Sequence, residues 1–304
     1  EIKTRYENCK IIFDNILSDL TLRLNKLHNI TFSERSWNII LGTWLNEYIQ
    51  IFYKIYSQID YIKKNYNLDK IYTLDFRKFD FSVEDTHSFR VANAVDEWYY
   101  LLFSKIVNNF FEDIENITKN PSVSSFKKKI YKDDHKTTSI LKSLFNIQDN
   151  LFKKIINYDN HAVIINTALP LPYEKLLQLK VNLWPFDWPE KKIIYKNVDY
   201  DLRAKIKLNN ELVKTKVEKL IRENINIFIP KFAVENFSDL KKIAESKIFP
   251  QNPKFIFTST SYAYDECFKI YAAIKSEKRI KYFVGQHGHN YFTRIHHKFL
   301  PELN

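Results

Sequence analysis

One stretch of the chain decides its fold class: residues 254–288, which read KFIFTSTSYAYDECFKIYAAIKSEKRIKYFVGQHG. Residues 254–258 and 280–284 are short apolar runs, and residues 265–276 between them have helical spacing. Two strands joined by a helix make a βαβ unit, so we expect parallel strands with a right-handed crossover. This half of the chain therefore predicts a Rossmann-like parallel sheet.

A further strand is predicted upstream, where the apolar run AVIIN at residues 162–166 is bounded by turn-forming residues. Between this strand and the βαβ unit we expect two helices, a charged one at residues 201–223 and another at residues 238–246. The order of these elements is typical of an α/β architecture.

The N-terminal half is expected to be mainly helical. Apolar residues recur every three to four positions over residues 6–27, which predicts an amphipathic helix. A second helix is predicted from an N-cap at Ser33 to about residue 66, because the Ser33 hydroxyl can accept a hydrogen bond from the first helical N–H groups. We expect one short strand within residues 68–90 and a third helix over residues 91–117.

The best candidate for a linker is residues 119–136, which contain a proline, three serines and a lysine run. We therefore divide the chain into a mainly helical region with its linker, residues 1–136, and a Rossmann-like α/β region, residues 137–304. At about 100–200 residues per domain, the length fits one large or two ordinary domains.

Composition limits the function classes. The chain has 47 basic and 36 acidic side chains, a formal net charge of +11 that could serve nucleic acid, an anionic membrane surface or a phosphate-bearing substrate. Because the charges are scattered, a solvated surface explains them better. No uninterrupted apolar stretch reaches the about 18 residues of a membrane span. Cys9 and Cys267 lie far apart and fit a reducing compartment, without a disulfide scaffold or a structural metal.

Hydroxyl residues follow the first strand of the βαβ unit. In open parallel sheets, ligands bind beyond the carboxyl ends of the strands. Thr258 and Ser259 begin four consecutive hydroxyl residues at such an end, just before a predicted helix whose first N–H groups can bind an anion. We therefore interpret this segment as part of a phosphate-binding site.

The second strand ends in the sequence GQHG, residues 285–288. Gly285 and Gly288 would let the backbone turn sharply and approach a ligand, Gln286 could pair with a base or sugar, and His287 could donate to phosphate or act as acid or base. Arg294 is a further candidate partner for an anion. The alternative is that the glycines only shape a turn and the histidine is satisfied locally.

The chain has only three glycines, so the third, Gly42, needs a reason. In the middle of a helix it costs about 1 kcal/mol relative to alanine. Either Arg35 reaches an anionic group on the polar stripe that includes Gly42, or Gly42 serves a helix–helix contact on an otherwise solvated face.

The strings LNKLH, residues 24–28, and SERSWNIILGTWL, residues 33–45, resemble a known signature, LNxxH…SxRxWxxxLGxWL. The signature belongs to a bacterial family of transferases encoded in loci for lipopolysaccharide, capsule or flagellin glycan. Further segments resemble the family in order and spacing: residues 96–98, 253–259, 268–269 and 285–288.

The resemblance implies a GT-B-like glycosyltransferase with two α/β halves, which needs no metal and no cofactor. The substrate would be a nucleotide sugar, with CMP-activated nonulosonate or Kdo-like donors implied by some loci. The acceptor would be an envelope polysaccharide, a glycan or a lipid-linked glycan. We expect a cytoplasmic protein, leave open a peripheral association with the inner membrane, and expect no nucleic-acid partner.

Candidate site residues follow from the motifs and the resemblance together. We take His287 as the candidate catalytic residue. The candidates for donor binding are Thr258, Ser259, Gly285, Gln286, Gly288 and Arg294. The candidates for acceptor contacts, or for positioning, are His28, Arg35, Trp37 and Gly42.

The sequence also departs from the family pattern. His289 and Phe292 stand where family members often have glycine, which leaves the loop shape and the choice of donor open. The pattern begins before Glu1 and continues past Asn304, so we expect the chain to lack a first strand and most of a second α/β half. The absence of methionine agrees with a start that is not native.

A second class of function remains open. A non-catalytic carbohydrate- or membrane-associated assembly protein could keep the same fold, and the basic balance and the aromatic residues Trp184, Phe186 and Trp188 would suit it. Nucleic-acid binding ranks last, because the lysine run at residues 127–129 lacks interleaved aromatic residues.

Overall fold

The chain folds into two compact units, each assembled from separate stretches. The computed structural model describes residues 2–111, 114–120, 161–189, 193–211 and 213–286. Unit 1 comprises Glu1–Asn29, Trp44–Lys132 and Lys196–Glu235. Unit 2 comprises Ile30–Thr43, Asp133–Tyr195 and Asn236–Asn304. The boundary predicted at residues 136–137 lies outside the described residues, so the division at residue 136 stays a prediction.

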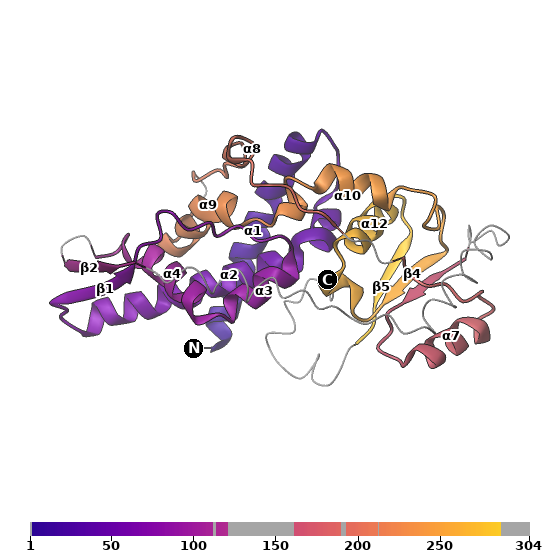
Figure 1. The fold of residues 1–304 in the computed structure, drawn as a ribbon, viewed down its shortest axis with the longest axis horizontal. Helices are drawn as coiled ribbons and strands as arrows, with labels where there is room; N and C mark the ends of the chain where they lie inside the picture. The colour runs from indigo at the N-terminus through magenta and orange to yellow at the C-terminus, as the bar shows by residue number, and fades with distance from the viewer. Residues whose placement is uncertain (1, 112–113, 121–160, 190–192, 212, 287–304) are drawn as a thin grey trace. The chain divides into compact units, whose positions relative to one another are not determined.

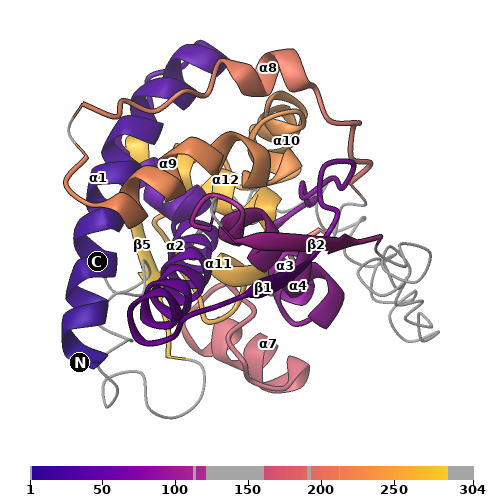
Figure 2. The ribbon, with the colours of Figure 1, turned by 90° about the vertical axis from the view of Figure 1, so that its left-hand side faces the viewer.

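Long amphipathic helices build unit 1. They are α1 (Ile2–His28), the part of α2 (Glu34–Asn65) from Trp44 onward, α3 (Thr86–Asn93), α4 (Asp96–Val107) and α9 (Lys216–Phe228). Figures 1 and 2 both show α9 alongside α1 and α2. Tyr48 on α2 donates a hydrogen bond to the Ile221 carbonyl on α9 at 2.7 Å. The buried aromatic core of this unit contains Trp44, Tyr48, Phe52, Phe89, Trp98 and Phe228.

Unit 1 also contains a pair of parallel strands, β1 (Lys70–Leu74) and β2 (Glu115–Lys119). The strand expected within residues 68–90 is confirmed as β1. The single helix expected over residues 91–117 is wrong. Two helices, α3 and α4, lie there instead, because a new helix begins at Asp96 with two acidic residues in its first turn, and the chain then becomes strand β2.

The helix expected at residues 201–223 is also two helices. The first, α8 (Tyr200–Ala204), begins after the N-cap Asp199, and α9 begins after the N-cap Thr215. Each cap accepts a hydrogen bond from a backbone N–H in the following first turn. Two separate caps within the predicted helix explain why it is divided.

Unit 2 contains a three-stranded parallel sheet in the order β3 (Val163–Ile165), β4 (Phe255–Thr258) and β5 (Lys281–Val284). The helix α12 (Glu266–Glu277) connects β4 to β5, so the predicted βαβ unit is confirmed (Figure 1). The predicted α/β class, with a helical N-terminal half and a parallel sheet in the C-terminal half, is confirmed as well.

Aromatic side chains pack around α12. Trp188 stacks on Phe249 with ring centroids 4.2 Å apart, and its ring centroid lies 5.2 Å from that of Tyr271 on α12. The helix α10 (Phe237–Ala244) packs against α12 and completes this side of the core. None of the helices in the described ranges is long and apolar enough to cross a membrane.

Candidate functional site

The carboxyl ends of the three parallel strands meet in unit 2, and backbone hydrogen bonds link them. The Ser259 N–H, just after β4, donates to the Asn166 carbonyl just after β3 at 3.0 Å. The Gly285 N–H, just after β5, donates to the Thr258 carbonyl at 2.7 Å. This strand edge, defined by residues 166, 258–261 and 285–286, is therefore held in one arrangement before any ligand binds.

The two hydroxyl residues predicted to bind the donor lie behind the surface of this edge. Thr258 and Ser259 are both buried. Thr258 Oγ1 accepts a hydrogen bond from the Ser261 N–H at 3.1 Å, at the start of the single-turn helix α11 (Ser261–Tyr264). The Thr258 side chain thus shapes the turn after β4, and the phosphate contact proposed for it stays a prediction.

The start of α12 is capped by the chain itself. Asp265 is its N-cap, and a side-chain oxygen of Asp265 accepts from the Phe268 N–H at 2.9 Å. Burial raises the pKa of Asp265, while hydrogen bonds from Phe268 and Trp188 oppose that shift. A carboxylate already occupies the position that an anion would take at this helix end.

Packing at the strand edge is tight at position 285. A Cβ atom there would lie 2.5 Å from Ser259 Oγ and 2.6 Å from Cζ of Phe257. Real Cβ atoms essentially never approach other atoms so closely. The contacts favour the alternative in which Gly285 shapes the turn, and they also place the end of β5 directly against the end of β4.

Three polar residues of the strand edge reach its surface: Asn166 and Gln286 are exposed, and Thr260 is half-buried. Asn166 Nδ2 donates to Ser261 Oγ at 2.7 Å, and Asn166 has a φ of 49°, a left-handed conformation that asparagine tolerates. Asn166 is not among the predicted site residues, although an asparagine directly after a buried apolar run is a usable signal. His287, Gly288 and Arg294 lie outside the described residues.

The signature segment of residues 33–45 begins with a helix cap. Ser33 precedes α2, its hydroxyl accepts from the Ser36 N–H at 3.2 Å, and the predicted N-cap is confirmed. The hydroxyls of Ser33 and Ser36 and the Ser33 N–H each lie 2.6 Å from Glu277 Oε1 and donate to it. Burial raises the pKa of Glu277, but these hydrogen bonds outweigh it and hold that pKa below its ordinary value.

The other candidate residues of this segment lie partly in the core of unit 2 and partly at its surface. Trp37 is fully buried, with its ring centroid 5.2 Å from that of Phe237. Gly42 is buried as well, whereas Arg35 is exposed on the first turn of α2. Trp37 therefore acts in the core, and among the candidates in this segment Arg35 is the one that solvent reaches.

The structure does not bring the two motif segments together. Ser33 and Ser36 contact Glu277, the last residue of α12, whereas Asp265 precedes the first residue, next to the strand edge. Twelve residues of helix separate these ends by about 18 Å at ~1.5 Å per residue. Arg35 consequently lies near the opposite end of α12 from Thr258 and Gly285.

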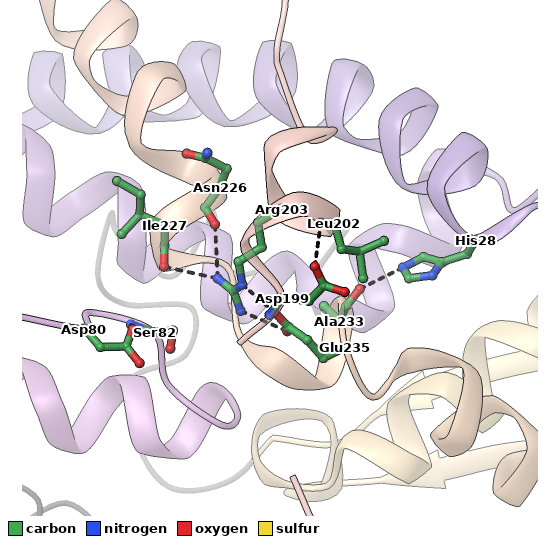
Figure 3. Close-up of polar contacts among 10 residues, drawn as sticks. All are labelled: His28, Asp80, Ser82, Asp199, Leu202, Arg203, Asn226, Ile227, Ala233 and Glu235. Atoms are coloured by element: carbon green, nitrogen blue, oxygen red, sulfur yellow. Dashed lines mark hydrogen bonds and ion pairs between the residues drawn. The ribbon is translucent and has the colours of Figure 1, made fainter. Parts of the chain in front are cut away.

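His28, the last residue of α1, belongs to unit 1. Its Nε2 lies 2.9 Å from the Ala233 carbonyl oxygen (Figure 3). Because a carbonyl can only accept, Nε2 carries the proton and donates. Burial lowers the pKa of His28, and the hydrogen bond to Ala233 opposes that shift. The contact fixes the segment before Glu235, so His28 has a visible structural role.

Sequence reasoning missed a buried ion pair next to this contact. Arg203 Nε and Nη2 donate to the two carboxylate oxygens of Glu235 at 2.6 and 3.0 Å. Arg203 Nη1 donates to the carbonyls of Asn226 and Ile227 at 3.0 and 3.2 Å (Figure 3). Since all three guanidinium nitrogens donate within the chain, this Arg203–Glu235 cluster joins α8 to the end of α9. No local sequence pattern signals a pair 32 residues apart.

In the portions of the chain that the structure describes, no group of three or more His, Cys, Asp or Glu side chains is arranged to hold a metal ion. At the strand edge, the described polar side chains that reach the surface are the amides of Asn166 and Gln286 and the Thr260 hydroxyl. Amides and hydroxyls are suited to hydrogen-bonding sugars, bases and phosphates.

Comparison with known proteins gives one family. The family described as "LIC12162 family transferase" matches residues 1–300. Neither the curated proteins nor the solved structures include a match to the chain. The family match covers both units and nearly the whole sequence, so this chain belongs to the LIC12162 family of transferases.

Proposed function

We propose that the transferred group is a sugar, and that its nucleotide-activated donor binds over the strand edge of unit 2. The observation that carries this proposal is the linked carboxyl edge of β3, β4 and β5, with Asn166, Thr260 and Gln286 at its surface. Ligands of open parallel sheets bind at this edge, where loops after the strands supply the contacts.

The close approach of the strand ends supports the proposal. The Thr258 carbonyl accepts from the Gly285 N–H at 2.7 Å, which sets Gln286 immediately beside the turn after β4. A ligand that contacted Gln286 could therefore reach Thr260 as well. The backbone of these turns is already hydrogen-bonded, so the loops lose little freedom when a ligand binds, which favours affinity.

The reaction would be a displacement at the anomeric carbon. An acceptor hydroxyl oxygen forms a bond to that carbon, the bond from the carbon to the phosphate oxygen breaks, and the nucleotide leaves with the electron pair. A base must take the hydroxyl proton, and donors must stabilise the charge on the leaving phosphate. We assign the base or the phosphate contact to His287, with Arg294 as a further phosphate contact.

The finer identity of the substrates rests on the resemblance. We propose a CMP-activated nonulosonate or Kdo-like donor and an envelope glycan or lipid-linked acceptor. The donor is a substrate, and the proposed reaction needs no resident cofactor or metal ion.

Thermal unfolding with added nucleotide tests the proposal. We expect CMP to raise the unfolding temperature of the complete protein more than UDP or GDP does, because a ligand at about 100 times its Kd stabilises by about 2.7 kcal/mol. Gln286→Ala should weaken this shift. Gln58 is an exposed glutamine of α2 in unit 1, so the matched control Gln58→Ala should leave the shift unchanged.

Two results would count against the proposal. Stabilisation by no nucleotide at all would favour the non-catalytic assembly protein. A nucleotide shift that Gln286→Ala leaves unchanged would place the donor away from the strand edge.

A further inference from the structure

The helix α7 (Leu171–Lys180) buries polar side chains on one side and exposes apolar side chains on the other. Its polar residues Glu174 and Gln178, one turn apart, are buried. Glu174 accepts hydrogen bonds from the N–H and the hydroxyl of Thr167 at 2.7 and 2.8 Å. The Gln178 amide donates to the Ile164 carbonyl at 2.6 Å and accepts from the Phe186 N–H at 3.0 Å. These bonds fix α7 against β3 by its polar side.

The opposite side of α7 and its flanks carry large apolar side chains in solvent. Six of them are between 41% and 62% exposed: Leu169, Tyr173, Leu176, Leu179, Val181 and Trp184. We call this set the α7 apolar face. Figure 1 shows α7 beside the three-stranded sheet of unit 2. A concentration of exposed apolar residues within sixteen positions marks an interaction surface, since isolated ones would need no explanation.

The charges around the α7 apolar face indicate which kind of partner it can bind. Glu174, the one acidic residue in the described stretch 168–184, is buried and hydrogen-bonded, and Lys180 is exposed. Lys175 pairs with Asp187. Leucine together with tyrosine, tryptophan and lysine, with no exposed acid within residues 168–184, suits a segment that lies in the headgroup region of an anionic bilayer.

We propose that the α7 apolar face binds the surface of a bilayer that contains anionic lipids. Tyr173, Leu176, Leu179 and Trp184 enter the boundary between headgroups and acyl chains, and Lys180 contacts lipid phosphates. The net charge of +11 adds a long-range attraction to the same surface. This binding is independent of the transfer reaction, so it stands even if the substrate is not a nucleotide sugar.

Flotation with vesicles tests the proposal on the complete protein. We expect it to float with vesicles of equal parts phosphatidylcholine and phosphatidylglycerol, and to float less with phosphatidylcholine alone. Leu176→Ser combined with Leu179→Ser should lower the bound fraction at least about tenfold, because two leucines leave the lipid boundary. Lys180→Glu should reduce binding to the anionic vesicles only.

The matched control combines Ile11→Ser with Leu22→Ser, two exposed apolar residues of α1, and should float like the unmodified protein. Since all four leucine and isoleucine positions are exposed, circular dichroism melts should show that both variants fold. Equal flotation of both variants would overturn the proposal. So would a dimer in solution that only the α7 variant dissociates, because a second copy would then cover this face.

Discussion

The strand edge of unit 2 and the Arg203–Glu235 cluster of unit 1 are both polar, but they use their polar groups differently. In the cluster, every nitrogen of Arg203 donates to a buried partner within the chain. At the strand edge, Thr258 is buried and used in the same way. Asn166 and Thr260 also make hydrogen bonds within the chain, but they reach the surface, as Gln286 does. The difference separates polar groups that are shielded from solvent from polar groups that a ligand can reach.

The largest expected effect is on the cluster. Arg203→Met should lower the free energy of unfolding by about 3–5 kcal/mol, because it leaves the Glu235 carboxylate buried without its cation. Urea denaturation measures this loss. The control Lys205→Met removes an exposed cation nearby and should stay within about 0.5 kcal/mol. Equal stability of the two variants would mean that the cluster does not hold unit 1 together.

The residue after Gln286 in the sequence should affect activity. His287→Ala should lower the rate of the proposed sugar transfer by about 10²–10⁴-fold, the usual contribution of a general acid or base, with unfolding unchanged. His87, an exposed histidine of α3, gives a control: the His87→Ala variant should transfer at the rate of the unmodified protein. If the His287 variant transferred at the normal rate, His287 would have no part in the mechanism.

Position 285 tests how tightly the strand edge is packed. Gly285→Ala should cost about 1–3 kcal/mol of stability, since its Cβ would overlap Ser259 Oγ and the Phe257 ring. A second substitution, Ser259→Ala, removes one of these contacts and should recover part of the loss in a denaturation experiment. If Gly285→Ala were as stable as the unmodified protein, the packing explanation for this glycine would fail.

A smaller effect is expected at the opposite end of α12. Ser33→Ala removes the N-cap of α2 and a hydrogen bond to Glu277, so it should cost about 0.5–2 kcal/mol in a thermal melt. Nucleotide binding should not change, because α12 separates Ser33 from the strand edge. The nearby exposed Thr31→Ala serves as control. Loss of nucleotide binding in the Ser33 variant would contradict this separation, because it would show that residues 33–45 and the strand edge act in one site.

The smallest effect concerns pH. Burial lowers the pKa of His28, so below about pH 6.5 the unfolded chain binds a proton that the folded chain does not. Stability should therefore decrease as the pH falls through this range toward the lower folded pKa. His28→Gln can still donate to Ala233 but cannot titrate, and its unfolding free energy should decrease less between pH 7 and pH values just below ~6.5. An identical pH dependence in both proteins would assign the effect to other groups.

Local patterns predict the elements of this fold where periodicity and caps agree. The helices α1, α2 and α12 and the strands β3, β4 and β5 follow from such patterns. Strand β2 does not, because most of its residues are exposed and its formation depends on pairing with β1, 45 residues away between Lys70 and Glu115. Long-range pairing of this kind leaves no periodic signal in the chain.

The position of the candidate residues at adjacent strand ends was predictable, but their individual hydrogen bonds were not. Sequence spacing correctly put residues 258 and 285 at adjacent strand ends. It could not reveal that the Thr258 hydroxyl faces inward to the turn that follows, or that Ser33 and Ser36 meet Glu277 rather than a ligand. Those contacts depend on which partner lies nearest in space, which residue type alone does not determine.

The interleaving of the two units has a practical consequence for genetics and for folding. Each unit draws on three separate stretches of the chain, so a single cut within the described residues cannot release either unit whole. A deletion that removes the segment around Arg203 takes material from unit 1 although it follows strand β3 of unit 2 in the sequence. We expect translation that stops between β3 and Glu235 to leave both units incomplete, because each unit then still lacks a stretch that follows β3 in the sequence.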